Sequence, residues 1–135
     1  MNDPVWVGRA REALEAMVDG NHAGAVAAVT AVLDSETAAE AIPGMVLWWV
    51  DSLFAVTRPL TPAFVPATVP GVSDAQMWAL RMMAARANDD FEEAQRVFDE
   101  AFSADCDLLI EYLGTLLTVV AQKLRGTRAH RARYN

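Results

Sequence analysis

The chain has 135 residues, 53% of them apolar, and its 18 acidic and 11 basic side chains leave a net charge of −7. This composition excludes an intrinsically disordered chain, and the length suits one domain that buries roughly two-thirds of its unfolded surface. The negative charge argues against a protein whose whole surface follows nucleic acid, and the single cysteine, Cys106, excludes internal disulfides.

The first predicted helix begins at Asp3-Pro4 and runs to about Asp19. An aspartate at a helix start can accept a hydrogen bond from a free backbone N–H. A proline in the first turn loses only a donor that has no partner there. Gly20 then supplies the left-handed conformation that commonly ends a helix.

The second predicted helix is capped by Asn21 and extends to about Leu33. Between these two residues the chain is almost entirely alanine and valine, with one glycine, Gly24. Such small side chains allow a close approach of the backbone to other elements. We therefore expect this helix to pack tightly between its neighbours.

The third predicted helix starts at the sequence Thr37-Ala-Ala-Glu40, which has the spacing of a capping box, and runs to about Val56. Pro43 falls within its first two turns, where a lost hydrogen bond costs least, but Pro43-Gly44 leaves open a kink or a later start. The stretch MVLWWVDSLFAV that follows is apolar on almost every side. Such a helix is usually buried all round.

Four prolines interrupt residues 58–72 and predict an extended loop there, because none of the intervening stretches is long enough for a helix. The loop joins two related helical halves, 3–57 and 73–126. Together they form one all-α domain of about six helices over residues 1–126. Residues 127–135 have no apolar face and are predicted to be a flexible basic tail.

Three helices are predicted in the second half, each opened by a side chain that can accept a hydrogen bond from a free backbone N–H. Their expected ranges, counted from the capping residue, are 73–87, 90–102 and 105–126. The first of them opens with a second capping box, formed by Ser73 and Gln76.

An internal repeat relates the two halves. A shift of 69 residues places Gly20–Ala25 on Asp89–Ala94 and aligns the helices that follow, and this period is close to twice 34. The segment NDDFEEAQRVFDEAF resembles the turn and second helix of a tetratricopeptide repeat. The residues at the family's aromatic and alanine positions are Trp78, Ala94, Phe98 and Ala101.

The resemblance to the tetratricopeptide family covers about 25 residues of the second half and, more faintly, about 14 of the first. It departs from the family at Arg81-Met82, where a leucine-glycine pair is expected, and no proline closes either unit. The family implies stacked helical hairpins with a concave surface for a peptide or a partner protein. Without the family, short loops between successive helices still imply a bundle of helical hairpins.

Candidate chemistry is sparse. Nine carboxylates lie between Asp89 and Glu111, but helix capping and solvation explain them, because a calcium loop needs a glycine that is missing here. Neither His22 nor His130 has the partners of a zinc or catalytic histidine, and no serine lies in a strained-turn motif. We therefore predict no enzyme, no catalytic residue, no metal and no cofactor, and an enzyme that uses an unfamiliar set of carboxylates is the third hypothesis.

The pair Trp48-Trp49 is the strongest candidate for a binding site. Consecutive helical side chains point about 100° apart, so both rings cannot share one narrow core stripe. We expect one ring in the core and the other against a partner or ligand. The leading hypothesis is a protein-interaction or adaptor module that self-associates through its apolar helices. The residues predicted for the interface or its supporting core are Trp48, Trp49, Leu113, Leu116 and Leu117.

The alternative hypothesis is a helical domain that binds a small apolar ligand or senses an effector. In that case methionine and tryptophan side chains line a cavity between helices, although an ordinary packed core explains the same residues. The residues concerned are Met45, Trp48, Trp49, Met77, Trp78, Met82 and Met83.

The termini and the apolar runs bear on location and on other partners. The start of the chain lacks the pattern of a secretory signal, and no apolar run approaches the roughly twenty residues of a membrane span. Abundant alanine and ten arginines against one lysine indicate a GC-rich bacterial genome. We expect a cytoplasmic protein without membrane contact. Five basic residues between positions 123 and 133 leave a weak tail contact with phosphates open.

Overall fold

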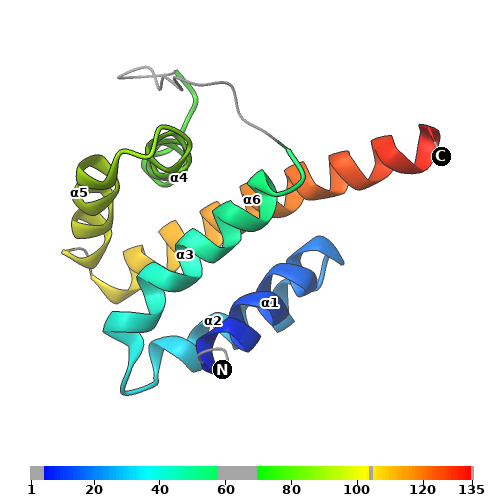
Figure 1. Cartoon of the computed structure of the whole chain (residues 1–135). Coiled ribbons are helices and arrows are strands. Elements are labelled where there is room, and N and C mark those ends of the chain that lie inside the picture. The colour runs from blue at the N-terminus through cyan, green and yellow to red at the C-terminus, as the bar shows by residue number, and fades with distance from the viewer. Residues whose placement is uncertain (1–4, 58–69, 104, 135) are drawn as a thin grey trace. The chain divides into compact units, whose positions relative to one another are not determined.

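The computed structural model describes residues 5–57, 70–103 and 105–134, and within these ranges the chain is all-α, with helices and no strand. This confirms the predicted fold class. The start signal at Asp3-Pro4 and most of the proline-rich segment lie outside the described residues. The helices are α1 Val5–Val18, α2 His22–Leu33, α3 Ala38–Phe54, α4 Asp74–Ala87, α5 Phe91–Phe102 and α6 Cys106–Tyr134 (Figure 1).

The chain forms two compact units, and α6 contributes to both. The first unit contains α1, α2, α3 and α6 from Leu117 onward. The second contains α4, α5 and α6 up to Leu116. The units therefore differ from the predicted halves 3–57 and 73–126, because the later part of the last helix belongs with the first three helices.

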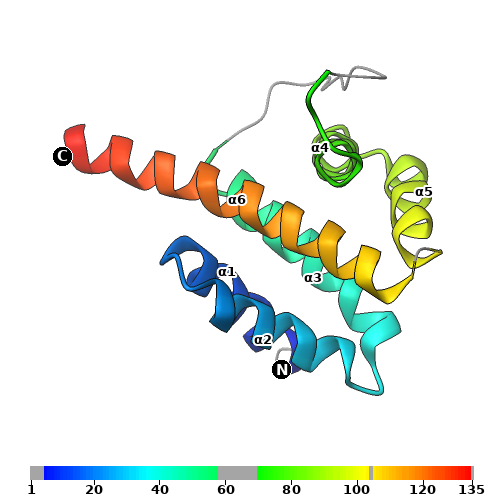
Figure 2. The ribbon, with the colours of Figure 1, turned by 180° about the vertical axis from the view of Figure 1, so that it is seen from behind.

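In the first unit α1 packs along α2 and also contacts α3. The views in Figures 1 and 2 agree that α1 and α2 lie side by side. The buried side chains of α1 recur every three or four residues, which gives the helix one apolar face. They are Ala10, Ala13, Leu14, Met17 and Val18.

Helix α3 passes through Pro43 and Gly44 without interruption. Gly44 allows the ring of Trp6 to lie against the helix, because a Cβ atom at this position would be 2.5 Å from Cζ2 of Trp6. The glycine that looked like a possible helix breaker is therefore required for packing between α1 and α3.

The predicted capping box at the start of α3 is wrong. Thr37 occupies the N-cap position, but its side chain makes no capping bond. Its backbone, with φ −101° and ψ 16°, continues a turn from Ser35 instead of adopting the extended conformation that a capping side chain needs. The backbone N–H of Glu40 donates to the carbonyl oxygen of Thr37 at 3.1 Å, so a main-chain bond replaces the side-chain cap.

In the second unit α4 packs against α5, and the predicted caps are confirmed. The N–H of Gln76 donates to Oγ of Ser73 at 3.2 Å, and the N–H of Ser73 donates to Oε1 of Gln76 at 2.9 Å. The N–H of Glu93 donates to Oδ1 of Asp90 at 3.1 Å. Because these bonds need only residues close in sequence, the local pattern suffices to predict both helix starts.

The α1–α2 and α4–α5 hairpins correspond in length and in turn geometry. Helices α1 and α4 each have 14 residues, and α2 and α5 each have 12. Gly20 has a φ of 80°, and Asp89, 69 positions later, has a φ of 52°. In the same turns the N–H of Asn21 donates to Ala16 at 2.7 Å, and the N–H of Asp90 donates to Ala85 at 2.9 Å.

The buried positions of α2 and α5 also correspond. Every buried residue of α2 has a buried residue of α5 69 positions later. The pairs are Ala25 with Ala94, Ala28 with Val97, Val29 with Phe98, and Val32 with Ala101. The same helical face is therefore packed in each hairpin.

The predicted end of the last helix is wrong. Asp105 does open α6, because its Oδ1 accepts from the N–H of Leu108 at 2.8 Å, but the helix continues past Gly126 to Tyr134. A glycine inside a helix costs only about 1 kcal/mol relative to alanine, and the following residues are mainly alanine and arginine, which favour helix. The sequence 127–135 was predicted to be a flexible tail, yet its backbone through residue 134 is helical.

Candidate functional site

The two adjacent tryptophans have different environments, both within the first unit. Trp49 is completely buried, and its Nε1–H donates to the carbonyl oxygen of Ala10 in α1 at 2.9 Å. Trp48 is only half-buried. The prediction that one ring enters the core is confirmed, and the structure identifies that ring as Trp49.

Trp48 lines a hollow between α1, α3 and the later part of α6, which we name the Trp48 groove. Its volume is about 230 Å³. All of its lining residues belong to the first unit: Arg11, Leu14, Glu15 and Val18 from α1, Trp48, Ser52 and Val56 from α3, and Leu124 and Thr127 from α6.

The groove combines an apolar interior with a charged edge. Leu14, Val18 and Leu124 are buried, whereas Arg11 and Glu15 are exposed one helical turn apart on α1. An apolar floor of this kind can desolvate a hydrophobic group, while the two opposite charges can orient polar atoms around it.

Two residues with hydroxyl groups, Ser52 and Thr127, also line the groove. The hydroxyl of Ser52 donates to the carbonyl oxygen of Trp48 at 2.7 Å, which holds the serine side chain against its own helix. Thr127 Oγ1 lies 3.2 Å from Thr57 Oγ1 and donates to the carbonyl oxygen of Lys123 at 3.0 Å. The lining residues include neither histidine nor cysteine.

Apart from Met77, the other predicted site residues are buried and fall in both units. Met45 and Leu117 join Trp49 in the core of the first unit. The remaining residues, which are buried in the second unit, are Trp78, Met82, Leu113 and Leu116. Of the predicted interface and pocket residues, Trp48 in the first unit and Met77 in the second are half-buried, and the others lie in the cores of their units.

Trp78 is a buried tryptophan of the second unit and lies on α4, whereas Trp49 of the first unit lies on α3. Its Nε1–H donates to the carbonyl oxygen of Val97 in α5 at 2.7 Å. Its ring stacks on Tyr112, with ring centroids 5.5 Å apart and planes inclined by 12°. Burial raises the pKa of the Tyr112 hydroxyl, and the nearby carboxylates of Asp74 and Glu100 add to this shift.

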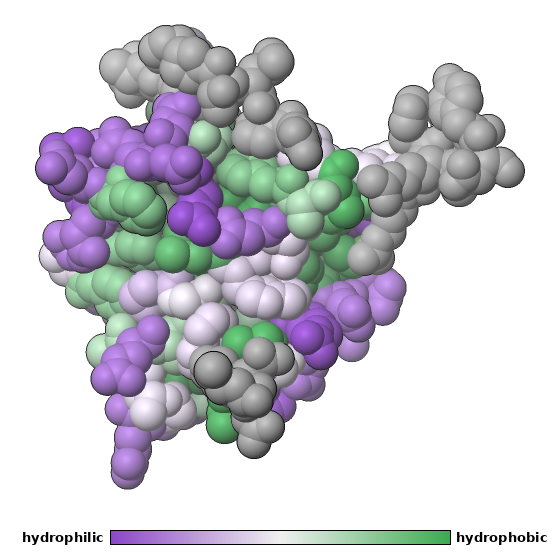
Figure 3. All heavy atoms as spheres, viewed as in Figure 1, coloured by the Kyte–Doolittle hydropathy of each residue, from purple (hydrophilic) through white to green (hydrophobic). Residues whose placement is uncertain are grey.

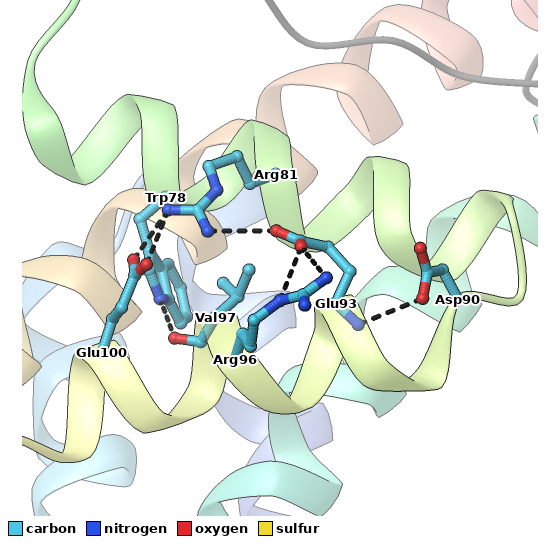
Figure 4. Close-up of polar contacts among 7 residues, drawn as sticks. All are labelled: Trp78, Arg81, Asp90, Glu93, Arg96, Val97 and Glu100. Atoms are coloured by element: carbon cyan, nitrogen blue, oxygen red, sulfur yellow. Dashed lines mark hydrogen bonds and ion pairs between the residues drawn. The ribbon is translucent and has the colours of Figure 1, made fainter. Parts of the chain in front are cut away.

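Arg81 is a charged residue whose role the sequence did not reveal. It projects from α4 between two carboxylates of α5, donating to Glu93 at 3.0 Å and to Glu100 at 2.7 Å (Figure 4). Arg96 donates to the other oxygen of Glu93 at 2.7 Å. These arginine bonds, with that from Arg81 the stronger, hold the pKa of Glu93 below its ordinary value.

The second hairpin presents many charged side chains to solvent, together with the exposed rings of Phe91 and Phe102. Figure 3 shows hydrophilic side chains gathered over α4 and α5. This explains much of the acidic stretch, because its members cap helices or pair with arginines across the hairpin. Within the part of the chain that the structure describes, no group of three or more His, Cys, Asp or Glu side chains could hold a metal ion.

The outer face of α2 differs from its predicted environment. The helix was expected to pack between neighbours, but Ala23, Val26, Ala27 and Ala31 are exposed in the structure, Val26 to 54%. The tight packing is confined to the opposite face. The apolar composition of α2 on its own could not show which of its two apolar faces is covered.

Comparison with known proteins gives no relatives. No family model, no curated protein and no solved structure matches the chain. Among the described residues, none of the helices combines the length and apolar character required to cross a bilayer.

Proposed function

We propose that the chain is a protein-interaction module whose Trp48 groove receives an anchoring side chain of a protein partner. The observation that carries this proposal is the half-buried Trp48 ring beside the fully buried Trp49. Partly exposed tryptophans in hollows are typical of the residues that dominate interface energies. The buried Trp49 fixes α3 against α1 and so positions its neighbour.

The size of the groove favours an anchor side chain over a small-molecule ligand. Small-molecule sites commonly have volumes of about 300–1,000 Å³. The Trp48 groove, at about 230 Å³, has room for one large side chain. The predicted alternative, an apolar effector held among methionines and tryptophans, has less support, because Met45, Trp49, Trp78 and Met82 are packed inside their units.

The arrangement around Trp48 matches the usual anatomy of a protein interface. A central aromatic side chain with an apolar floor is surrounded by a polar rim, here Arg11 and Glu15, which excludes water and orients the partner. A tetratricopeptide-like origin and a cytoplasmic location remain part of this proposal, since stacked hairpins of that family present concave surfaces to peptides.

Affinity capture from the native host, with both protein and metabolite readouts, tests this function. The baits are the wild type, Trp48→Ala, and Phe91→Ala as a matched control that removes an aromatic side chain exposed to 71% outside the groove. We expect a protein that wild type and Phe91→Ala retain equally. Trp48→Ala should weaken its binding about thirtyfold or more, which is the usual loss at an interface hot spot.

Two outcomes would contradict the proposal. A protein partner that binds Trp48→Ala as tightly as wild type would place the interaction elsewhere on the chain. A small molecule retained by wild type and lost from Trp48→Ala, without any protein partner, would instead support the ligand-binding alternative.

A further inference from the structure

A partly exposed row of aromatic side chains runs along one edge of α5 in the second unit, and we name it the phenylalanine edge. It consists of Phe91, Phe98 and Phe102, whose spacings of seven and four residues place them within about 40° of one another around the helix. Phe98 is buried, whereas Phe91 is exposed to 71% and Phe102 to 40%. The two exposed positions lie about 16 Å apart along the helix axis.

The phenylalanine edge continues the packed face of α5 out to solvent. The ring of Phe102 lies against that of Phe98, with centroids 6.5 Å apart and planes inclined by 32°. The corresponding positions of α2 carry His22, Val29 and Leu33, so the repeat itself does not require aromatic side chains here. Large rings left exposed along one edge of a helix are typical of a contact surface.

Acidic side chains run beside the phenylalanine edge. Glu92 follows Phe91 and Asp99 follows Phe98, so both acidic residues lie about 100° further round α5, and both are exposed. In the part of the chain that the structure describes, the ion pairs of this hairpin join its arginines to other carboxylates, and none includes Glu92 or Asp99. These two charges are therefore available to a partner.

The net negative charge of the chain falls on the second unit. Residues 70–116 contain ten acidic side chains and three arginines, which gives −7, the charge of the entire chain. The remaining residues carry equal numbers of acidic and basic side chains. An acidic surface of this kind attracts cationic segments and repels anionic ones, including nucleic acids and anionic lipids. Charge complementarity therefore selects a basic occupant for the phenylalanine edge.

We propose that the phenylalanine edge binds a lysine- and arginine-rich segment of another protein, which presents large apolar side chains to Phe91 and Phe102. The two kinds of contact are adjacent, because the aromatic row and the acidic side chains form neighbouring strips of one helix. An amphipathic basic helix lying along α5 meets both strips. Its apolar face covers the exposed rings, and its cations lie beside Glu92 and Asp99.

The chain's own basic segment does not supply this occupant. Residues 123–133 contain five bases, but their only large apolar side chain, Leu124, is buried in the first unit. No residue of the phenylalanine edge lines the Trp48 groove, and the edge belongs to the other unit, so the inference does not rest on the proposed function. In affinity capture, a partner of the edge would be lost from Phe91→Ala and retained by Trp48→Ala, the reverse of the pattern for the groove.

Fluorescence anisotropy of a labelled peptide with the full chain tests the proposal. The probe is an amphipathic helical peptide of leucine and lysine, about 14 residues long so that it covers the edge, and its controls replace lysine by glutamate or leucine by alanine. We expect the leucine–lysine peptide to bind with a Kd on the order of 10–100 µM, and each control about tenfold more weakly or worse. Raising the salt concentration from about 50 to about 500 mM should weaken binding about tenfold, because the charges lie at the surface.

Variants of the chain locate the peptide. Phe91→Ala should raise the Kd of the leucine–lysine peptide about fivefold or more, and Glu92→Gln about two- to threefold. The matched controls, which should bind like wild type, are Val26→Ala for an exposed apolar side chain and Glu36→Gln for an exposed charge, both in the first unit. Circular dichroism checks that the variants keep their helices, as expected for exposed positions.

Other results would overturn the inference. Tight binding of the glutamate peptide would contradict a basic partner, and equal binding of the alanine peptide would contradict the role of the rings. Binding that Trp48→Ala abolishes and Phe91→Ala leaves unchanged would place the peptide in the groove. Absence of binding at about 500 µM would overturn the proposal as a whole, and self-association that Phe91→Ala abolishes would then assign the edge to a second copy.

Discussion

The α1–α2 and α4–α5 hairpins have the same helix lengths, the same turn geometry and the same buried positions in their second helices, yet they meet solvent differently. Helix α5 is amphipathic, with its outer face held by ion pairs from Arg81 to Glu93 and Glu100. Helix α2 is apolar on its outer face as well. The same buried positions therefore occur in two hairpins whose exposed faces differ, one charged and one apolar.

The two units can also be compared through their buried tryptophans, Trp49 and Trp78. In each unit one buried indole donates to a helix carbonyl oxygen, from Trp49 to Ala10 and from Trp78 to Val97. Trp78 stacks on Tyr112 in addition. In each unit a tryptophan side chain thus joins two helices by both packing and a hydrogen bond.

Removal of either buried indole should have the largest effect. Trp49→Ala and Trp78→Ala should each lower the free energy of unfolding by about 3–5 kcal/mol, because each leaves a cavity and removes a hydrogen bond. Urea unfolding followed by circular dichroism measures this loss. If one variant loses less than about 1 kcal/mol, the two anchors are not equivalent and the comparison between the units fails.

A methyl group at Gly44 should have the next largest effect. Gly44→Ala should destabilise the first unit by about 1–3 kcal/mol, since its Cβ would overlap the Trp6 ring. Gly8→Ala is the matched control, because nothing lies within 4 Å of a Cβ there, and it should stabilise α1 by about 0.5–1 kcal/mol. Thermal unfolding of both variants gives the comparison. Stabilisation by Gly44→Ala would contradict the close contact with Trp6.

Substitutions in the two hairpin turns should change the free energy of unfolding in opposite directions. Gly20→Ala should cost about 1 kcal/mol, because alanine is strained at a φ of 80°. Asp89→Gly should gain a few tenths to about 1 kcal/mol, because it gives the second turn the residue that suits its φ of 52°. Chemical denaturation measures both changes. An equal sign for the two would show that the turns are not equivalent.

A lower pH should destabilise the second hairpin through protonation of Glu93. This is the smallest of the expected effects. The pKa of Glu93 is lowered in the folded state, first by Arg81 and then by Arg96, so its contribution to stability is present above the ordinary value of 4.5. The contribution falls below that pH and is lost as the pH passes through the lowered pKa. Because the pairs are partly exposed, it should be less than about 1 kcal/mol.

Unfolding measured at pH 7 and at pH 4 should therefore show a smaller decrease for Arg81→Gln than for wild type. Arg9→Gln, which removes a charge from the exposed Arg9–Glu12 pair of the other hairpin, controls for the loss of one positive charge. A decrease that is identical in wild type and Arg81→Gln would show that this ion pair does not contribute to acid sensitivity.

Local sequence patterns predicted most helix starts because a cap is made by residues three positions apart. Asn21, Ser73, Asp90 and Asp105 all accept from the expected backbone N–H groups. Thr37 has the same kind of pattern and fails, because the preceding turn sets its backbone and keeps it from the extended conformation. A sequence motif indicates which capping bonds are possible. The conformation of the preceding backbone determines which of these bonds form.

Features that depend on contacts between distant residues were predicted less well. The angle between consecutive helical side chains showed that the rings of Trp48 and Trp49 must point in different directions. It did not show which ring enters the core. The pairing of Arg81 with α5 needs the α4–α5 packing, which spacing alone does not give. The outer face of α2 is apolar in sequence, and only the structure shows that its first unit leaves it uncovered.

The two indole hydrogen bonds provide a separate measure of local opening for each unit. A ring N–H that donates to a buried carbonyl oxygen exchanges with solvent deuterium only when the structure around it opens. The Trp49 and Trp78 ring protons lie in different units, so their exchange rates give two separate opening free energies in one sample. Equal rates would mean that the chain opens as one cooperative body, and unequal rates would rank the stability of its parts.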